Sequence, residues 1–402
     1  MKWEKTTIGE HCTVTSSKRF HLSDRSENGV PFYCSKEIIQ KVNGQEINDC
    51  DYIKEEAYDE VKKRFGVPEK DDLLITTRGT YGVPYIYKKT DRFYFSDGNL
   101  TWLKDFDNKL SVNYLYYWIL SYEGQKKIDA IAKGTAQKAV PIALIRNIEL
   151  SIPPLETQHR IASILSAYDN LIENNQKQIK LLEEMAQRLY KEWFVDLRFP
   201  DWENTKIVDG VPEGWRKVKL SEICSILRRG ISPKYNEKGK YLVINQKCIR
   251  TSIMDMTESR RQEKDYSKEL NLQDTDTVIC STGTGTLGRV GQVFGEHKDT
   301  TFDSHVTLVR SKEYHNFVYH AIKYQQPYLM GRGRGSTNQQ ELYRGVIEAL
   351  EIFIPTKELL SSSEILFSDI HKKTTILIEQ INRLKFARDR LLPKLMSGEI
   401  EV

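Results

Sequence analysis

The chain has 402 residues, with 60 Lys and Arg against 56 Asp and Glu, so its formal net charge is only +4. This length predicts two or three domains, and a composition of 39% hydrophobic and 29% charged residues is typical of a soluble, folded chain. No run of 18 apolar residues occurs and the first residues lack the apolar core of a secretory signal, so we expect a cytoplasmic protein with no membrane partner. The small basic excess permits nucleic-acid binding without indicating it.

The first 155 residues predict a mixed domain of strands and helices. Segments 72–77 and 83–87 are rich in β-branched and aromatic residues and are separated by glycine, which is typical of strands joined by a turn. Segment 111–128 has apolar residues at three- and four-residue steps and predicts a helix. The order of the strands cannot be deduced from these patterns.

A long helix is predicted next. Residues 159–194 contain neither Pro nor Gly, and apolar residues alternate by four and three, which is the pattern of a heptad seam. At 1.5 Å per residue such a helix is roughly 54 Å long, more than one globular domain needs. The seam residues expected to pair with another helix are Ile161, Leu165, Ile172, Ile179, Leu182, Leu189 and Trp193.

The second half of the sequence repeats the first. RGTYGVPYIY at 78–87 aligns with TGTLGRVGQV at 284–293, and SDGNLTWLK at 96–104 aligns with FDSHVTLVR at 302–310. Matches in the same order and at nearly constant spacing indicate a duplicated unit. A second mixed domain is therefore predicted at 212–356.

The duplication extends to a second heptad helix in segment 357–402. Its expected pairing residues are Phe367, Ile370, Leu377, Ile381, Leu384, Leu391 and Leu395. We expect this helix to pair with the one in segment 156–200 as a coiled coil. The alternative is that each helix is amphipathic and packs only on its own domain.

Basic and amide-rich clusters lie in loop-like segments, and each cluster of the first domain has a counterpart in the second. Lys and Arg neutralise phosphates, whereas Arg, Asn and Gln can form paired hydrogen bonds with purine edges. For any single residue, an ordinary solvated surface position is the alternative. The candidates for nucleic-acid binding in the first domain are Lys18, Arg19, Arg78, Thr80, Tyr81, Lys133, Thr135, Gln137 and Lys138. Those in the second are Arg228, Arg229, Lys234, Tyr235, Thr284, Arg289, His305, Arg332, Arg334, Asn338, Gln339 and Gln340.

Motifs of catalytic, metal and cofactor sites are missing from the sequence. The cysteines form no CxxC pair and the histidines no HExxH motif, so no metal site is expected. GTGTLG at 283–288 has the spacing of a dinucleotide-binding loop, but a strand-like segment follows it, and a tight turn between strands is the better interpretation. The sequence therefore predicts no catalytic residue and no cofactor bound by this chain.

Three segments carry a resemblance to a known family. IPPLETQHRIASILSAYDNLIENNQKQIKLLEEMAQRLYKEWF at 152–194 closely resembles the central helical region of the specificity subunits of type I restriction–modification systems. GVPEGWRKVKLSEI at 210–223 looks like the start of their second target-recognition domain, and LLPKLMSGEI at 391–400 is similar to their C-terminal signature. With the duplication, the resemblance covers essentially the full chain.

The resemblance implies an α+β fold with two target-recognition domains, at 1–155 and 212–356, each reading one half of a split DNA sequence. Helical spacers at 156–200 and 357–402 would form an antiparallel coiled coil whose length sets the distance between the half-sites. The implied partners are double-stranded DNA, two modification subunits and up to two restriction subunits. S-adenosylmethionine, used to methylate adenine N6, and ATP with Mg²⁺ are expected on those subunits, because the specificity subunit has no catalytic site.

Two other functions stay open at this point. One is a divergent DNA methyltransferase or nuclease with its own active site. The other is a coiled-coil scaffold that joins two protein-binding domains and does not bind DNA. The DNA sequence that is read, and which residues contact bases rather than phosphates, cannot be deduced.

Overall fold

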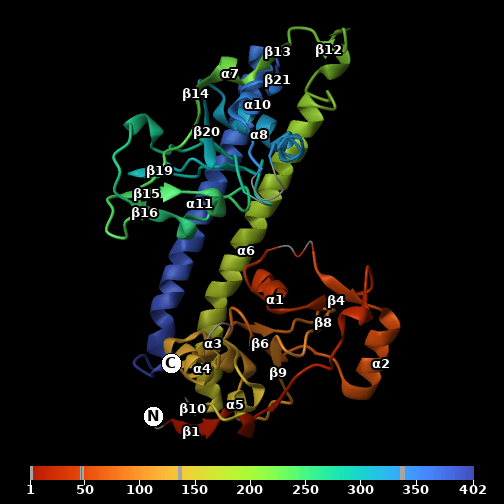
Figure 1. The fold of residues 1–402 in the computed structure, drawn as a ribbon, viewed down its shortest axis with the longest axis vertical. Coiled ribbons are helices and arrows are strands. Elements are labelled where there is room, and N and C mark those ends of the chain that lie inside the picture. The colour runs from red at the N-terminus through yellow and green to blue at the C-terminus, as the bar shows by residue number, and fades with distance from the viewer. Residues whose placement is uncertain (1–2, 46, 48, 135–137, 284, 336–339) are drawn as a thin grey trace. The chain divides into compact units, whose positions relative to one another are not determined.

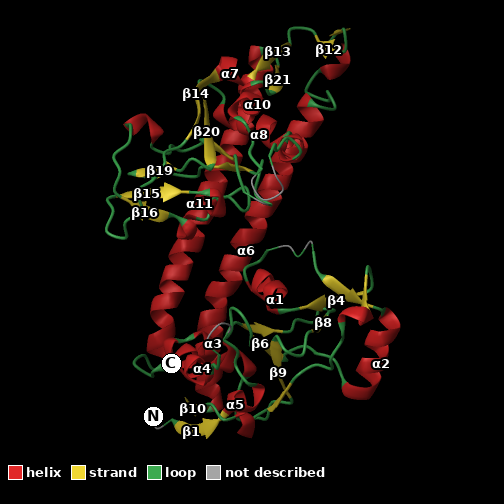
Figure 2. Ribbon diagram, in the orientation of Figure 1, coloured by secondary structure: helices red, strands yellow, loops and turns green. Residues whose placement is uncertain are grey.

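The computed structural model describes residues 3–45, 47, 49–134, 138–283, 285–335 and 340–402. Helices and strands are mixed along the chain (Figures 1 and 2), as the predicted α+β class requires. The chain forms two compact units, which we call the first unit (Met1–Gln176 with Gln380–Val402) and the second unit (Lys177–Glu379). Each unit thus contains one mixed domain and a part of both long helices, so the boundary between units falls inside these helices.

Two four-stranded sheets and one strand pair form the β-structure of the first unit. The first sheet has the order β2-β9-β6-β7 and is antiparallel throughout. The second has the order β3-β5-β4-β8 and includes one parallel pair, β4 with β8. The strands are β1 (Glu4–Thr7), β2 (Thr13–Thr15), β3 (Arg25–Ser26), β4 (Val30–Tyr33), β5 (Asp51–Ile53), β6 (Leu73–Thr76), β7 (Pro84–Ile86), β8 (Tyr94–Phe95), β9 (Leu100–Lys104) and β10 (Glu149–Ile152), with β1 paired to β10.

Five short helices complete the domain of the first unit. They are α1 (Ser35–Val42), α2 (Glu55–Phe65), α3 (Val112–Leu120), α4 (Tyr122–Ile131) and α5 (Ile142–Arg146). Helix α3 begins within the predicted helical segment and supplies Tyr114, Leu115 and Trp118 to the main core. The same core contains Ile161 and Leu395 from the long helices, which are therefore packed on this domain.

The second unit has the same sheet plan. Its antiparallel sheet has the order β14-β20-β17-β18, which matches β2-β9-β6-β7 strand for strand, and its smaller sheet has the order β16-β15-β19. The strands are β11 (Ile207–Val208), β12 (Val211–Pro212), β13 (Arg216–Lys219), β14 (Cys224–Arg229), β15 (Tyr241–Ile244), β16 (Arg260–Gln262), β17 (Thr277–Cys280), β18 (Val290–Gln292), β19 (Thr300–Phe302), β20 (Val306–Ser311) and β21 (Glu351–Ile354). The short helices are α7 (Leu220–Ile223), α8 (His315–Tyr324), α9 (Gln326–Met330) and α10 (Arg344–Glu348). The common plan confirms the predicted duplication.

The described residues of the GTGTLG segment, 283 and 285–288, form a turn between strands, as predicted. It joins β17 to β18, which pair antiparallel. Gly288 has a φ of +74°, and a Cβ at this position would lie 2.5 Å from the backbone nitrogen of Met330. Glycine is therefore required by both the backbone conformation and the close approach of another segment.

The two long helices, α6 (Leu155–Phe194) and α11 (Lys357–Met396), have 40 residues each. In the first unit the Asp169 carboxylate pairs with the Arg388 guanidinium at 2.6 Å, and the Asn175 side-chain amide donates to Gln380 at 3.2 Å. Of these two contacts, the one farther along α6 is the one earlier along α11, so the two helices run antiparallel. The alternative of two helices that do not pair with each other is therefore wrong. All of the predicted seam residues are buried or half-buried.

Polar residues interrupt the seam of α11 without breaking it. Ser363 is fully buried and its hydroxyl donates to the carbonyl of Leu360 at 2.8 Å. Arg388, also at a seam position, is held by Asp169. Ser363 and Arg388 thus both have hydrogen-bonding partners within their units. Among the described residues, no helix is both long enough and apolar enough to span a membrane.

Candidate nucleic-acid interface

Strand pairing in the first unit brings three of the predicted loops to one end of a sheet. β6 ends at Thr76, opposite the start of β9 at Leu100, and β2 ends beside the same part of β9. The segments that follow β2 and β6 and precede β9 therefore leave the sheet together. They include the predicted candidates Lys18, Arg19 and Arg78. We call this end, with the described residues 16–19, 77–83, 96–99, 133–134 and 138–140, the loop end of the first unit.

The second unit has a loop end built in the same way. β17 ends at Cys280, opposite Val306 at the start of β20, and β14 ends at Arg229, opposite Thr307. The described residues 230–235, 281–283, 285–289, 303–305, 334–335 and 340–342 form this loop end. The antiparallel sheet therefore gathers the basic clusters that the sequence shows at separate places.

Backbone hydrogen bonds join the loops of the first unit. The amide of Thr77 donates to the carbonyl of Asn99 at 2.8 Å, and the carbonyl of Thr77 accepts from the amide of Val140 at 2.9 Å. Lys133 and Ala139 exchange two backbone hydrogen bonds of 2.8 Å, so these two residues pair as an antiparallel bridge. Thr77, the residue that follows β6, is thus bonded to both of the other loops, at Asn99 and at Val140.

The second unit repeats these hydrogen bonds. The amide of Ser281 donates to the carbonyl of His305 at 2.8 Å, and its carbonyl accepts from the amide of Leu342 at 2.8 Å. Arg334 and Glu341 exchange backbone hydrogen bonds of 3.0 and 2.9 Å and so form the equivalent antiparallel bridge. Two copies of one loop framework are therefore present, and their backbone contacts do not depend on which side chains they carry.

The candidate side chains of the first unit are mostly free to meet a ligand. Lys18, Arg78, Thr80, Lys133 and Lys138 are exposed. Arg19 pairs with Asp97 at 2.9 Å yet stays 68% exposed, and Tyr81 is half-buried. Thr135 and Gln137 lie outside the described residues. The loop end of this unit thus presents several cations within a short stretch of surface.

Arginines of the second unit are more often engaged by carboxylates. Arg229 pairs with Glu341 and also donates to the carbonyl of Leu342 at 2.9 Å. Arg228 lies 3.6 Å from Glu269, and Lys234 pairs with Glu263. Arg229 is therefore tied into the loop framework.

The other candidates of the second unit have varied surroundings. The Arg260 guanidinium lies 3.5 Å from the centre of the Tyr235 ring, and that of Arg332 lies 4.5 Å from the Tyr328 ring. Arg289 is half-buried, while His305, Arg334 and Gln340 are exposed. Thr284, Asn338 and Gln339 lie outside the described residues.

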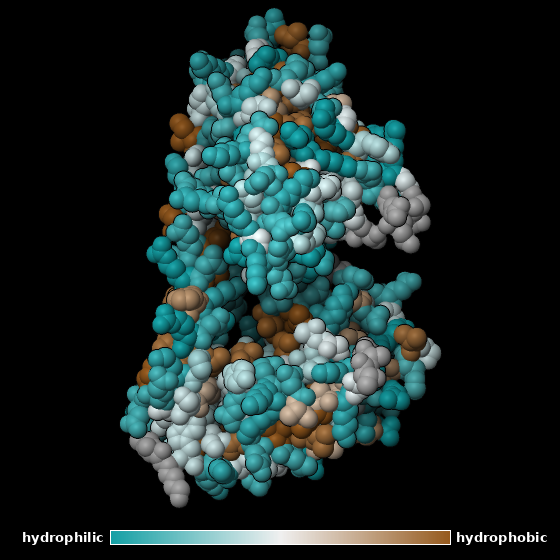
Figure 3. All heavy atoms as spheres, turned by 60° about the vertical axis from the view of Figure 1, so that its left-hand side comes forward, coloured by the Kyte–Doolittle hydropathy of each residue, from teal (hydrophilic) through white to brown (hydrophobic). Residues whose placement is uncertain are grey.

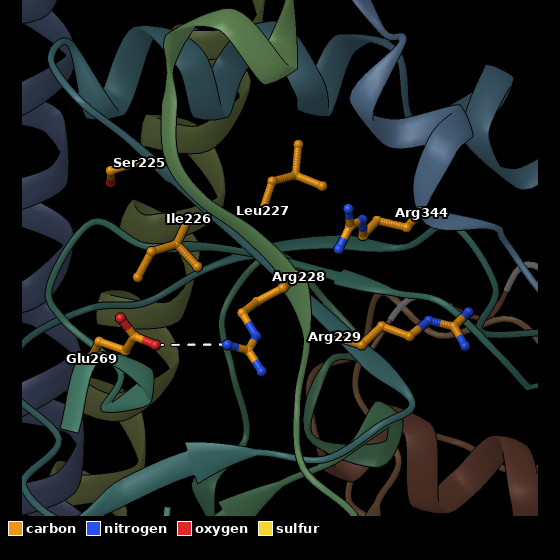
Figure 4. Close-up of a pocket in the computed structure, with 7 residues that line it drawn as sticks. All are labelled: Ser225, Ile226, Leu227, Arg228, Arg229, Glu269 and Arg344. Carbon is orange, nitrogen blue, oxygen red and sulfur yellow. Dashed lines mark ion pairs between the residues drawn. The ribbon is translucent and has the colours of Figure 1, made fainter. Parts of the chain in front are cut away.

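An open hollow of about 610 Å³ lies along β14 in the second unit. Figure 4 shows its lining side chains, Ser225, Ile226, Leu227, Arg228, Arg229, Glu269 and Arg344. Three guanidinium groups around one hollow are suited to phosphate oxygens. Arg344 is not among the predicted residues because it lies far along the chain from the others, and only the packing of α10 against β14 brings it here.

Two further residues of the loop ends were not predicted. Thr282 directly follows Ser281, the residue whose backbone amide and carbonyl bond to the other two loops, and the Thr282 hydroxyl lies 2.6 Å from Nδ1 of His305. Asn99 occupies the position of His305 in the first unit. The alignment of 96–104 with 302–310 could have identified Asn99, whereas the contact of Thr282 with His305 required the strand register.

The described residues contain no group of three His, Cys, Asp or Glu side chains arranged to hold a metal ion. Burial raises the pKa of the Cys12 thiol to about 12, with smaller effects of nearby charges, and burial likewise raises the pKa of the Cys280 thiol to about 12. These thiols are therefore protonated at neutral pH and are poor nucleophiles. The chemistry of the loop ends is that of binding through cations and hydrogen-bonding side chains.

Comparison with known proteins gives matches along most of the chain. A family model described as the type I restriction modification DNA specificity domain matches residues 1–184 and 212–384. The type I restriction enzyme MjaIX specificity subunit of Methanocaldococcus jannaschii is 26% identical over 354 residues, which cover 83% of this chain and 78% of that protein. The HindI specificity subunit of Haemophilus influenzae is 23% identical over 363 residues, covering 71% and 77% of the two chains.

A solved structure shares the fold. The crystal structure of the S subunit of a type I restriction–modification system from M. genitalium superposes with a TM-score of 0.58 at 18% sequence identity. The superposition covers 98% of this chain and 96% of that one. Each segment matched by the family model includes one loop end.

Proposed function

Because the chain belongs to the type I restriction–modification DNA specificity family, we propose that it reads a bipartite sequence in double-stranded DNA, one half-site with each loop end. DNA recognition is the function of the family. The single observation that carries the bipartite reading is the repeated framework of backbone hydrogen bonds around Thr77 and Ser281. Two equivalent frameworks that hold cationic loops provide two equivalent reading surfaces.

The cations of the loop ends supply the contacts to phosphates. Each phosphate neutralised by Lys or Arg releases counterions, so affinity falls as salt rises. Around the hollow of the second unit, Arg228 and Arg344 are placed for one such contact, whereas Arg229 is held by Glu341. Bases are then read by the side chains at the ends of β6, β9, β17 and β20, which the framework fixes in position.

In this proposal the chain is not itself an enzyme and acts in the cytoplasm with partner subunits. Two modification subunits methylate adenine N6 with S-adenosylmethionine, and up to two restriction subunits use ATP and Mg²⁺. These groups belong to the partners.

The long helices offer apolar side chains for docking the modification subunits. Hydrophilic side chains cover most of the face drawn in Figure 3, and hydrophobic ones lie in small separate groups. In the second unit Leu181 on α6 is 63% exposed, and Ile365 and Ile376 on α11 are 63% and 50% exposed. These exposed apolar side chains are the ones that a modification subunit docked on the helices would cover.

The proposal is tested by mapping adenine methylation on DNA incubated with the chain, its modification subunit and S-adenosylmethionine. We expect methylation at one bipartite motif, and no methyl transfer by the chain alone. Methylation at an undivided motif would contradict the two reading surfaces. Methyl transfer or cleavage by the isolated chain would show instead that it has an active site of its own.

A further inference from the structure

One position in each loop end combines a fixed backbone with a variable side chain. In the first unit the carbonyl of Asn99 accepts from the Thr77 amide at 2.8 Å and from the Ser35 hydroxyl at 3.0 Å. In the second unit the carbonyl of His305 accepts from the Ser281 amide at 2.8 Å. The backbone is therefore held in the same way, while the side chain is an amide in one unit and an imidazole in the other.

In the second unit a neighbouring hydroxyl orients the imidazole. Nδ1 of His305 lies 2.6 Å from the Thr282 hydroxyl, and the His305 amide donates to the Asp303 carboxylate at 2.9 Å. The His305 side chain is exposed. Nε2 lies across the ring from Nδ1 and makes no hydrogen bond with any described residue, so it is available to a ligand.

In the first unit an arginine occupies the place of Thr282 in the strand register, because Arg78 bridges Ala139 as Thr282 bridges Glu341. The sequence repeat aligns Arg78 with Thr284 instead, since the second unit has two more residues at this point of the chain. Arg78 follows Thr77 as Thr282 follows Ser281, and a Cβ on Gly98 would lie 3.9 Å from a guanidinium nitrogen of Arg78. This places the guanidinium beside the residue that precedes Asn99. The Asn99 side-chain nitrogen donates to the Ser96 hydroxyl at 2.9 Å, which orients the amide.

The two pairs have the chemistry of base recognition and differ from each other. Arg forms paired hydrogen bonds with O6 and N7 of guanine, and Asn does so with N6 and N7 of adenine. A tethered imidazole offers a single donor or acceptor, according to which ring nitrogen carries the proton. The same framework therefore presents different hydrogen-bonding groups in the two units.

We propose that Arg78 with Asn99 in the first unit, and Thr282 with His305 in the second, are the residue pairs that read bases in the major groove and make the two half-sites differ. This inference rests on the proposed function of the chain. It adds Asn99 and Thr282 to the binding residues and separates these pairs from cations that contact only phosphates.

The test exchanges the pairs between units and maps adenine methylation together with the modification subunit. The double variant Arg78→Thr, Asn99→His should reduce methylation at the original first half-site about tenfold or more and change its preferred base at one position, since each good base contact discriminates by that order. The second half-site should be unchanged. Thr282→Arg with His305→Asn should have the mirror-image effect.

Matched controls come from exposed residues outside the loop ends. His159→Asn on α6 and Arg64→Thr on α2 remove the same side chains from helix surfaces and should leave the motif unaltered. Thermal unfolding of every variant checks folding, and the single change His305→Asn serves if a double variant is unstable.

Three results would overturn the inference while wild-type methylation at a bipartite motif still supports the proposed function. The first is an unchanged motif in both double variants. The second is an equal change in both half-sites. The third is uniform weakening of binding at all sequences with a smaller salt dependence, which would make these residues phosphate contacts. Loss of any motif with the wild-type chain would instead contradict the proposed function.

Discussion

The loop ends of the two units have the same backbone hydrogen bonds but differ in charge. In the first unit the residue that exchanges backbone hydrogen bonds with Lys133 is Ala139, whose side chain has no charge. In the second unit the equivalent residue is Glu341, and it binds Arg229. Main-chain hydrogen bonds set the framework in both units, so the charges and hydrogen-bonding groups of its side chains can change without loss of the fold.

The units also differ at the other end of the same sheet. In the second unit Asp276 and Arg310 form a buried ion pair with bonds of 2.7 and 2.6 Å, and their side chains are 2% and 11% exposed. In the first unit the equivalent Asp72 accepts from the Trp102 indole at 2.8 Å, and Lys104 replaces the arginine. One unit thus depends on a buried ion pair where the other uses a neutral donor.

The largest expected effect is the loss of stability on breaking that ion pair. Arg310→Ala leaves the Asp276 carboxylate buried without its partner, which should cost about 3–5 kcal/mol in the free energy of unfolding of the second unit. Lys104→Ala, the matched change in the first unit, should cost less than about 1 kcal/mol because the Lys104 ammonium lies 3.7 Å from the exposed Asp105 carboxylate and 4.7 Å from the centre of the Trp102 ring, and Asp72 keeps its hydrogen bond from the Trp102 indole. Denaturant unfolding followed by hydrogen exchange of β6 and β17 measures each unit separately. Equal costs would contradict the comparison.

A smaller effect, about 2 kcal/mol, is expected on acidification from pH 7 to pH 5. Burial, with His371 and Lys323 nearby, lowers the pKa of His320 to about 3 from 6.5. Between these pH values the imidazole of His320 is protonated in the unfolded chain but neutral in the folded unit. The free energy of unfolding therefore falls as pH drops from about 6.5 towards 3, by about 1.4 kcal/mol per pH unit. Burial also lowers the pKa of His297, which adds to the loss in this unit.

The first unit lacks this source of acid sensitivity. Its helix α3 contacts α6 through Tyr117, whose hydroxyl donates to Asp169 at 2.6 Å. Burial and that carboxylate raise the pKa of Tyr117, so it stays neutral throughout the acid range. His320→Gln should reduce the pH slope of the second unit by about one proton, as measured from unfolding free energies at pH 5 and 7. An unaltered slope would remove His320 as the cause.

The smallest expected effect concerns DNA affinity. Glu341→Ala gives the second loop end the residue found in the first and releases Arg229. We expect the slope of log affinity against log salt to steepen by about one, with a few-fold gain in low-salt affinity, because one more cation meets phosphate. Fluorescence anisotropy titrations at several salt concentrations measure this. The control is Glu60→Ala, which frees the exposed Arg64 on α2. If this control steepened the salt dependence equally, the gain could not be assigned to a contact of Arg229 with phosphate.

Much of the fold could be predicted because it follows from patterns of neighbouring residues in the sequence. Heptads identified both long helices, and repeated segments identified two copies of one domain. Antiparallel pairing of the helices came only from the family resemblance, since heptads permit either direction. The contacts between Asp169 and Arg388, and between Asn175 and Gln380, show it directly in the first unit.

The candidate site was predicted at the level of loops but not of contacts. Lys18, Arg78 and Lys133 were placed in turns from local composition, and the structure gathers those turns at one sheet end. The role of Glu341 could not be seen, because its partner Arg229 is distant in the chain and joined to it only by strand order. Arg344 was missed for the same reason.

The central claim is that one framework reads two different half-sites independently. It is tested most directly by replacing residues 1–155 with the equivalent domain of a relative and mapping adenine methylation by the assembled complex. The account predicts a motif in which one half-site has changed and the other is identical to that of the wild-type chain. A motif with both halves altered would contradict it.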